Sequence, residues 1–330
     1  NPHLKIIYQS PQGERIEFPR AIEQLPPVAK EIKPHPYGVE LGVLMRMLKA
    51  TKARTLSSFL SSEFSRVSTA VAKEICDHAG LSVEEKPLSL DHSSCEKLYH
   101  GIQKTKIMAP PTDCLSPIGE EGLLKALKKE VAADFYEVIT RKPSVYRGFP
   151  FQVEVGVAYG GNLPKDETIK LYRFTNKVPL LYQQSGCAVT RGVLATNWRA
   201  YGLSQSKGAL PVGPLVLVIH IASVWVPFTS EGKEAVAHYP EILKEIKLAL
   251  QDVGRKLGSY IRRTVRAKEQ QEKISLFEKY IPELAQSLSI LSEQPSKPIE
   301  EALQLLLKKG LPNLLAQLPE QEKTIPKESD

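Results

Sequence analysis

The feature that most constrains the fold is a β-rich, largely apolar run, residues 216–225, followed by a glycine-containing loop and a long amphipathic segment. The run is rich in β-branched residues and predicts a strand buried on both faces. After residue 240 apolar side chains recur at helical spacing, at Ile242, Ile246, Leu250, Val253, Leu257 and Ile261. Strand, loop and helix together predict an α/β domain with the loop at the strand-to-helix junction.

That loop, residues 229–236, carries Lys233 directly after Gly232. A lysine offered on a glycine-containing loop at such a junction is placed to reach a phosphate. The alternative is a solvated surface lysine at a helix start. The helix dipole disfavours a cation there, which favours the functional interpretation.

Bulk properties set limits on the protein. Its 330 residues are enough for two or three domains. No apolar run reaches the roughly 18 residues of a membrane span, and no signal-peptide pattern is present. Its 4 cysteines include no C-x-x-C pair, which argues against a zinc site and fits a reducing compartment. The net charge of +7 permits an anionic partner such as DNA.

Breaker clusters divide the chain. Residues 1–33 predict two strands around a turn at Pro11-Gln12-Gly13. Residues 38–106 predict several short helices, with Ser68 and either Asp91 or Ser93 as helix starts. Prolines at 34, 36, 110 and 111 mark the boundaries of this helical region.

Residues 113–268 predict an order α-β-β-α-β-α around one sheet. The helices expected are 119–138, 187–198 and the one after Lys233, and the strands are 151–159, 169–175 and 214–226. The turn Gly160-Gly161-Asn162 is expected to join the first two strands. A second helical region over 270–292, a short apolar helix over 299–318 and a disordered tail over 319–330 complete an α+β or α/β multidomain chain.

Four stretches, in their order and spacing, resemble the B subunit of DNA topoisomerase VI, a type IIB topoisomerase. They are Lys33 to Gly38 (KPHPYG), Pro110 to Glu120 (PPTDCLSPIGE), Arg173 to Tyr182 (RFTNKVPLLY) together with Asn197 to Leu203 (NWRAYGL), and the Lys233 loop with its helix.

The resemblance implies a domain plan. Residues 1–33 correspond to the end of a GHKL ATPase domain, 34–110 to a helix-two-turn-helix domain and 111–268 to a transducer domain like ribosomal S5 domain 2. Residues 269–318 form a C-terminal helical region without a family motif. The ATP-binding helix, its magnesium-holding asparagine and the glycine-rich lid are missing. ATP and Mg²⁺ are therefore expected in a full-length subunit, and none on this chain alone, which is expected to be a fragment without ATPase activity.

The resemblance also implies partners. They are the A subunit of topoisomerase VI, a second copy of the B subunit in an A2B2 heterotetramer, and double-stranded DNA, with no membrane involved. The cleaving tyrosine belongs to the A subunit. The expected location is the cytoplasm, with the nucleoid of a prokaryote, or the nucleus of a eukaryote.

By resemblance, Lys233 together with Gly232 senses the γ-phosphate of ATP. A charge-assisted contact of this kind contributes about 1.5–3 kcal/mol. Because the contact weakens after hydrolysis, it can bias a hinge between two domains.

Candidate DNA contacts come from two places. Trp198, Arg199 and Tyr201 match an aromatic-basic-x-aromatic motif near DNA, although relatives commonly carry Lys at the position of Arg199; Gln205 and Lys207 could extend it. The alternative is that both aromatics are core residues. Helix-start and nearby basic residues offer a second contact, namely Arg66, Ser68, Thr69, Lys73, Lys49, Lys52 and Arg54. A separate basic run on the long helix, Arg262, Arg263, Arg266 and Lys268, could meet DNA or the partner subunit, but a charge run is more often a solvated face.

Other interpretations stay open. The histidines, including His220, show no metal-ligand spacing and are given no role, and Asp113, Glu120 and Glu121 are explained by a helix N-terminus. A non-catalytic DNA-binding scaffold, like meiotic relatives of the B subunit, is the rival function. An RNA-associated protein rests on fold analogy alone.

Overall fold

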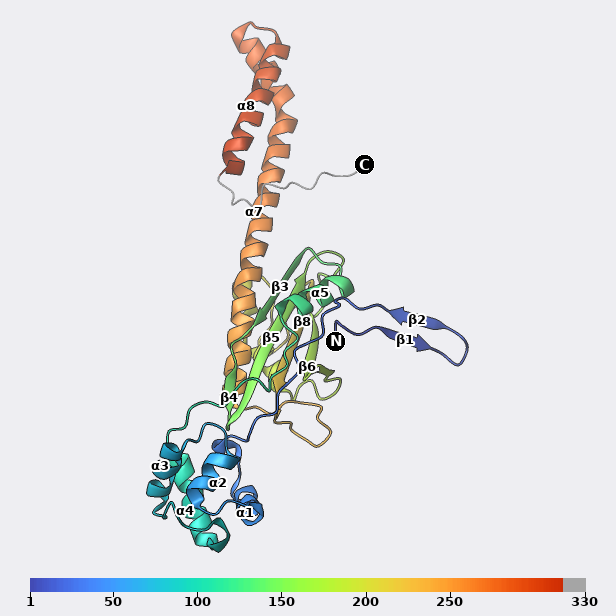
Figure 1. The fold of residues 1–330 in the computed structure, drawn as a ribbon. Coiled ribbons are helices and arrows are strands. Elements are labelled where there is room, and N and C mark those ends of the chain that lie inside the picture. Colours follow the sequence, from blue (N-terminus) through green and yellow to red (C-terminus); the bar gives the residue numbers. More distant parts are fainter. Residues whose placement is uncertain (317–330) are drawn as a thin grey trace. The chain divides into compact units, whose positions relative to one another are not determined.

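The computed structural model describes residues 1–316, so the predicted tail, 319–330, lies outside it. The chain divides into a unit of residues 1–259 and a second unit that begins at Tyr260. Each is described by itself, and Figure 1 labels their elements.

An N-terminal hairpin and a helical module open the first unit. Strands β1 (Ile6–Gln9) and β2 (Arg15–Phe18) pair antiparallel, with Ile6 opposite Phe18, as predicted. The helical module, residues 34–110, contains η1 (Pro36–Gly38), α1 (Leu41–Ala50), α2 (Leu56–Glu63), α3 (Thr69–Ala79), η2 (Pro87–Ser89) and α4 (His92–Lys104).

The predicted caps of this module are confirmed. The Ser68 side chain accepts from the backbone N–H of Val71 at the start of α3, and Gly80 ends that helix in the left-handed conformation. The Asp91 side chain caps α4 in the same way. The predicted apolar faces meet in one core, formed by Leu44, Leu48, Leu56, Phe59, Leu60, Ile75, Leu98 and Ile102 among others.

The centre of the first unit is a six-stranded mixed sheet. Its strands are β3 (Phe135–Thr140), β4 (Ser144–Tyr146), β5 (Phe149–Tyr159), β6 (Lys170–Thr175), β7 (Val178–Pro179) and β8 (Leu215–Ser223). They lie in the order β3-β5-β8-β6-β7, with β4 pairing to β5. All pairs are antiparallel except β6 with β8. Every residue of β8 is buried, which confirms the prediction from its continuous apolar run.

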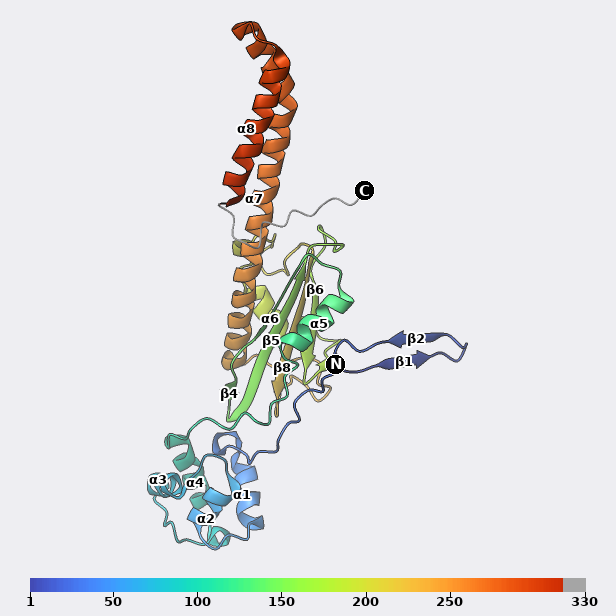
Figure 2. The same cartoon turned by 45° about the horizontal axis from the view of Figure 1, so that its top comes forward.

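Helices cover both faces of the sheet. On one face α5 (Glu120–Glu130) packs through Leu123 and Leu127 against Gly156, where an added Cβ would lie 2.7 Å from Leu127. Over the other face lie α6 (Ala188–Ala195) and the first part of α7 (Pro240–Ser292) (Figures 1 and 2). The short helix η3 (Trp198–Tyr201) packs against α7, with the Tyr201 ring at Gly254. Gly192 of α6 lets Ile246 of α7 approach, because an added Cβ would lie 2.5 Å from Ile246 Cγ2.

Two predictions of secondary structure are wrong around α5 and the central strands. The helix ends at Glu130, not Val138, because Phe135 and Val138 belong to β3 and pair with β5. A turn separates helix and strand, where Gly161 N–H donates to the Asp134 carboxylate at 2.6 Å. The predicted strands 151–159 and 169–175 exist but are not neighbours, because β8 lies between them.

The helix boundaries also differ from the expectation. The helix predicted over 187–198 ends at Ala195, and Trp198 opens the separate helix η3. Lys233 is not at a helix start, because α7 begins at Pro240; the dipole argument therefore does not apply to it. The helices expected after residues 240 and 270 are one helix, α7, which contains Pro282.

In the second unit, α8 (Ser296–Ala316) follows a short connection after α7 and turns back beside the end of that helix in both views (Figures 1 and 2). Ile281 and Ala285 are buried there. Much of the remaining apolar surface is exposed, including Phe277, Tyr280, Leu284, Leu288 and Leu291.

Candidate functional site

The loop that carries Lys233 has a fixed base. The Thr229 N–H donates to Ala235 O at 2.9 Å, and Ala237 N–H donates to Pro227 O at 2.8 Å. On its far side, the loop joins the start of α6, where Ala188 N–H donates to Val236 O at 2.8 Å. Ala235 and Val236 are fully buried. Residues 229–233 of the loop are exposed, and Glu234 is partly covered.

Lys233 itself has a left-handed backbone, with φ of 53°. This conformation costs an L-residue with a side chain about 1–2 kcal/mol. Its side chain is exposed, and its ammonium has no hydrogen bond or ion pair with the described side chains. A strained backbone that presents an unpaired cation is typical of a ligand-contacting position.

Gly232 shows no such strain. Its φ is not in the left-handed region, and an added Cβ would meet only the flexible Glu234 side chain, at 3.6 Å. The backbone of the loop therefore does not require glycine at 232 in this conformation.

The neighbouring segment 180–184 supports the loop. The Gln183 amide donates to the Glu234 carboxylate at 2.6 Å. Buried Arg173 of β6 holds this segment, because its guanidinium donates to Leu180 O at 2.9 Å and Tyr182 O at 3.0 Å. The sequence stretch from Arg173 to Tyr182 thus has a structural task beside the Lys233 loop.

The motif at Trp198 divides into a buried and an exposed part. Trp198 is fully buried, and its indole N–H donates to Val193 O at 2.9 Å. Its side chain cannot contact DNA directly in this structure, so the core alternative holds for it. Tyr201 packs edge-on against Trp198 and fills the space left by Gly254 of α7, where an added Cβ would lie 2.3 Å from its ring.

The basic members of this region are accessible. Arg199 is exposed, and its Nε donates to Gln205 O at 2.6 Å, which fixes the start of the side chain and leaves its outer nitrogens available. Lys207 is exposed in the following loop. Gln205 is buried and accepts from Trp198 N–H at 3.1 Å, so it stabilises the motif from inside.

In the helical module, Arg66 lies in the turn that leads into α3, with a left-handed φ of 61°. Its Nε donates to Ala109 O at 3.1 Å. Lys73 is exposed and lies about one turn after the start of α3. The remaining basic candidates, Lys49, Lys52, Arg54, Arg262, Arg263, Arg266 and Lys268, are exposed as well.

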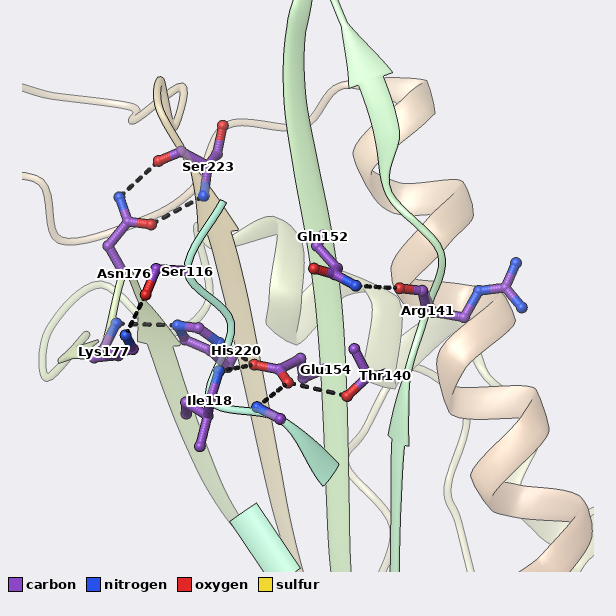
Figure 3. Close-up of polar contacts among 11 residues, drawn as sticks. Ser116, Ile118, Thr140, Arg141, Gln152, Glu154, Asn176, Lys177, His220 and Ser223 are labelled. Carbon is purple, nitrogen blue, oxygen red and sulfur yellow. Dashed lines mark hydrogen bonds and ion pairs between the residues drawn. The ribbon is translucent and has the colours of Figure 1, made fainter. Parts of the chain in front are cut away.

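A buried polar network centred on the inner strands β5 and β8 was not anticipated from the sequence (Figure 3). Glu154 of β5 and His220 of β8 are cross-strand partners and both fully buried, with Nδ1 to Oε2 at 2.7 Å. The Lys177 N–H donates to His220 Nε2 at 3.0 Å. Nε2 therefore carries no proton, so a neutral His220 donates from Nδ1 to Glu154.

Glu154 also organises the segment that leads into α5. Its carboxylate accepts from Ile118 N–H and Gly119 N–H, both at 2.8 Å, and from the Thr140 hydroxyl at 3.0 Å. Burial acts to raise the pKa of this carboxyl, but the hydrogen bonds from His220, Ile118 and Gly119 outweigh it and hold the pKa below its ordinary value. Glu154 is thus a buried carboxylate whose charge is stabilised by donors.

The turn between β6 and β7 belongs to the same network. Asn176 and Lys177 both have positive φ, 46° and 68°. The Lys177 ammonium donates to Ser116 Oγ at 2.7 Å, and Ser116 in turn donates to Pro27 O at 2.9 Å. Burial lowers the pKa of Lys177. The only signal in the sequence was a lone glutamate and a lone histidine inside two apolar strands.

The described residues, 1–316, contain no candidate metal cluster and no candidate membrane span. In residues 1–316 no group of three or more His, Cys, Asp or Glu side chains could hold a metal ion. No helix in that range is long and apolar enough to cross a membrane.

Comparison with known proteins places these features in a family. A family model described as the topoisomerase VI B subunit transducer matches residues 110–273. The type 2 DNA topoisomerase 6 B subunit of Methanococcoides burtonii is 50% identical over 289 residues, which is 88% of this chain and 46% of that protein. Those of Methanosarcina mazei and Archaeoglobus fulgidus are 48% and 47% identical, over 89% of this chain in each case and 47% and 49% of those proteins.

The chain spans about half the length of these curated relatives. The sheet with its covering helices coincides with the transducer match. On this similarity, the chain belongs to the topoisomerase VI B subunit family.

Proposed function

We propose that this chain is the coupling part of the B subunit of a type IIB topoisomerase, which transmits ATP binding to double-strand passage by the A subunit. The observation that carries the proposal is Lys233, a cation with a strained backbone on a loop with a fixed base, which has no ion pair among the described side chains. In this proposal Lys233 contacts the γ-phosphate of ATP, and the contact weakens after hydrolysis.

The first part of α7 is suited to relay such a contact. Arg141, which directly follows β3, bonds to Glu245 at 3.2 Å and to Asp252 at 3.1 Å, and Lys256 bonds to Glu137 of β3 at 2.7 Å. Together with the apolar face of the helix, these pairs fix the first turns of α7 to the sheet. A displacement of the sheet would therefore move this part of the helix with it.

The nucleotide would be held outside this chain. The β1–β2 hairpin exposes apolar side chains on both faces, among them Ile6, Ile7, Tyr8, Ile16 and Phe18. A two-stranded ribbon is marginally stable alone, so this surface suits contact with another domain. We infer that residues 1–33 adjoin a GHKL ATPase domain that binds ATP and Mg²⁺ in the full-length protein.

DNA would be contacted by exposed basic residues. Arg199 and Lys207 of the transducer, and Arg66 and Lys73 of the helical module, are accessible for phosphate contacts. Gln205, which also bonds to the backbone of Trp198, holds Arg199 in place through its carbonyl oxygen. We assign the helical module to the helix-two-turn-helix type and the sheet to the S5 type by resemblance.

The remaining partners follow from the same proposal. The exposed apolar side chains on α7 and α8 of the second unit suit docking of the A subunit, and a second copy of the B subunit would complete an A2B2 assembly. The membrane has no part in it.

DNA relaxation tests the proposal. The full-length B subunit, its Lys233→Ala variant, a Lys165→Ala control at another exposed loop lysine and the 330-residue chain are each combined with the A subunit, ATP and Mg²⁺. We expect relaxation by the full-length protein and the control, a loss of about tenfold or more for Lys233→Ala, and none for the 330-residue chain. Wild-type activity of Lys233→Ala would refute the phosphate contact and favour a non-catalytic scaffold.

A further inference from the structure

The turn between β4 and β5 has an unusual composition. It consists of Tyr146, Arg147, Gly148 and Phe149, called the relay turn below. Tyr146 pairs with Phe149, and the two residues between them have φ of 45° and 77°. Hairpin turns with two such residues strongly favour Asn-Gly, because both tolerate positive φ. An arginine at the first position is strained, which points to a task for its side chain.

On its outer side, the relay turn touches the helical module at two glycines. An added Cβ on Gly148 would lie 2.6 Å from Gly38 N and 3.1 Å from His35 Nδ1. An added Cβ on Gly38 would lie 3.0 Å from both Arg147 O and the Phe149 ring. The two backbones are therefore in direct contact, and neither glycine can be enlarged without moving them apart.

The residues it touches are tied to the far end of the same module. Buried His35 bonds through Nε2 to Met108 O at 2.9 Å. The Tyr37 hydroxyl donates to Thr105 O at 2.5 Å and accepts from Ile107 N–H at 3.2 Å. The relay turn thus meets the point where the chain enters and leaves the helical module.

On its inner side, the relay turn touches both ends of the segment that carries Lys233. The rings of Tyr146 and Tyr239 lie 4.3 Å apart, and the Arg147 guanidinium lies 5.6 Å and 5.3 Å from their centres. The Phe149 ring stacks on Trp225 with centroids 5.8 Å apart. Trp225 and Tyr239 bracket residues 226–238, and Tyr239 O accepts the first helical N–H of α7, from Leu243.

From these contacts we propose that the relay turn couples the helical module to the Lys233 loop, with Arg147 and Gly148 as positioning residues. A shift of the module at Gly38 displaces Gly148, and the aromatic contacts carry that displacement to both ends of residues 226–238. The proposal rests on the proposed function only in giving Lys233 its phosphate-sensing task. The coupling itself is a property of this chain and is testable without nucleotide.

Hydrogen–deuterium exchange of the 330-residue chain tests the coupling first. Gly148→Ala is compared with Gly80→Ala, because Gly80 has a similar φ of 67° but an added Cβ there meets nothing within 4 Å. We expect Gly148→Ala to raise exchange of the Thr229, Val236 and Ala237 amides roughly fivefold or more, and Gly80→Ala to leave them unchanged.

Coupling is reciprocal, which gives a second arm. Tyr239→Leu removes the ring beneath Arg147 and should raise exchange in residues 35–38 and 146–149. The coupling is overturned if Gly148→Ala leaves the 229–237 amides as protected as in the wild type, or if Tyr239→Leu leaves residues 35–38 unchanged.

Arg147→Asn separates the side chain from the backbone, because asparagine tolerates the left-handed conformation. The readout is Trp225, one of the 2 tryptophans; it is 60% exposed whereas Trp198 is 0% exposed, so iodide quenches Trp225 selectively. We expect that adding a DNA duplex of about 30 base pairs changes the iodide quenching of Trp225 in the wild type. Arg147→Asn should bind the same duplex equally well, but its Trp225 quenching should not change. An equal change in Arg147→Asn, or none in the wild type despite binding, would refute a role of the arginine.

Experiments on the full-length protein combined with the A subunit distinguish the phosphate contact of Lys233 from the coupling through the relay turn. Lys233→Ala should lower ATP-dependent relaxation both in the wild-type background and in the Arg147→Asn background. Arg147→Asn should leave the rate of ATP hydrolysis without DNA unchanged and lower the stimulation of that rate by DNA several-fold. A general loss of stability would lower both rates. If Lys233→Ala has no effect the phosphate contact fails, while the exchange experiment still decides the coupling. Absence of duplex binding would count against the DNA contacts alone.

Discussion

Several side chains that define the site sit on backbone conformations that an L-residue avoids. Lys233, Lys177 and Arg147 all have positive φ, yet each is long and charged. Each offers its charge at a turn where glycine or asparagine would fold more easily. These charged turn residues therefore carry a conformational cost that the contacts of their surroundings must offset.

His35 gives a pH prediction. Nδ1 accepts from Tyr37 N–H and Nε2 faces Met108 O, so the neutral ring fits and a second ring proton would oppose the Tyr37 N–H. Burial lowers the pKa of His35 below its ordinary value of 6.5. The hydrogen bond to Met108 acts to raise this pKa, and the charge of Arg66 acts to lower it further. The stabilisation is therefore present above pH 6.5 and is lost as the pH falls through the lowered pKa.

We expect the melting temperature of the wild type to fall more steeply between about pH 7.5 and 5.5 than that of His35→Gln, which cannot titrate. Differential scanning calorimetry at constant ionic strength measures this. The window avoids carboxylates, including Glu154, whose own lowered pKa removes stability only at lower pH. Parallel pH profiles of the two proteins would contradict the prediction.

Glu154→Gln is expected to destabilise the first unit. The amide that replaces one carboxylate oxygen places a donor against the backbone N–H of Ile118 or Gly119, and a buried donor left unpaired costs about 1–3 kcal/mol. Urea denaturation measures the loss. Glu121→Gln, on an exposed carboxylate of α5, is the control and should leave the midpoint of urea denaturation nearly unchanged. Equal effects of the two variants would argue against the network in Figure 3.

At the scale of elements, replacing a helix glycine with alanine is expected to stabilise the protein where there is open space and to destabilise it where two elements pack closely. In an exposed helix, Gly→Ala stabilises by roughly 0.5–1 kcal/mol, and Gly42 of α1 is such a site because an added Cβ meets nothing within 4 Å. Gly192 and Gly254 face Ile246 and the Tyr201 ring closely. We expect Gly192→Ala and Gly254→Ala to destabilise by about 1–3 kcal/mol.

Chemical denaturation of the three variants checks this contrast. A stabilising Gly254→Ala would mean that Tyr201 moves aside at little cost. In that case the aromatic motif would not be fixed to α7, and the placement of Arg199 would need another explanation.

Elements with strong local signals were predictable from the sequence. The caps at Ser68 and Asp91, the hairpin at residues 6–18 and the buried strand β8 follow from neighbouring residues and are confirmed. Strand β3 was missed, because the helical spacing of α5 continues through Phe135 and only pairing with β5 decides against it. The insertion of β8 between β5 and β6 depends on contacts distant in sequence, which no local pattern reports.

The candidate site was predictable in part for the same reason. The Lys233 loop was identified from its sequence context, and its exposure agrees with the interpretation, although its contact with a phosphate stays a prediction. The burial of Trp198 and the pairing of Glu154 with His220 depend on which distant segments meet, so a single sequence does not show them.

At the scale of the whole molecule, the second unit exposes apolar side chains at helical spacing: Phe277, Tyr280, Leu284, Leu288 and Leu291. We expect the double variant Leu284→Glu/Leu288→Glu to keep the melting temperature, because the two side chains are 46% and 41% exposed, and to bind the A subunit about tenfold more weakly or worse. Sedimentation velocity with the purified A subunit measures the complex. The control is Lys279→Glu, and an unchanged affinity of the double variant would place the docking surface elsewhere.

The position of β8 bears on the order in which the protein folds. It is the last strand of the sheet in the sequence, yet it lies between β5 and β6. During synthesis, the inner edges of β5 and β6 stay open until β8 has been made, and closing them requires contacts across many residues, which is slow. The Lys233 loop directly follows β8, so a nascent chain cannot present it before the sheet closes. If Lys233 contacts the γ-phosphate as proposed, an unfinished chain lacks that contact, and the open strand edges of β5 and β6 need protection in the meantime.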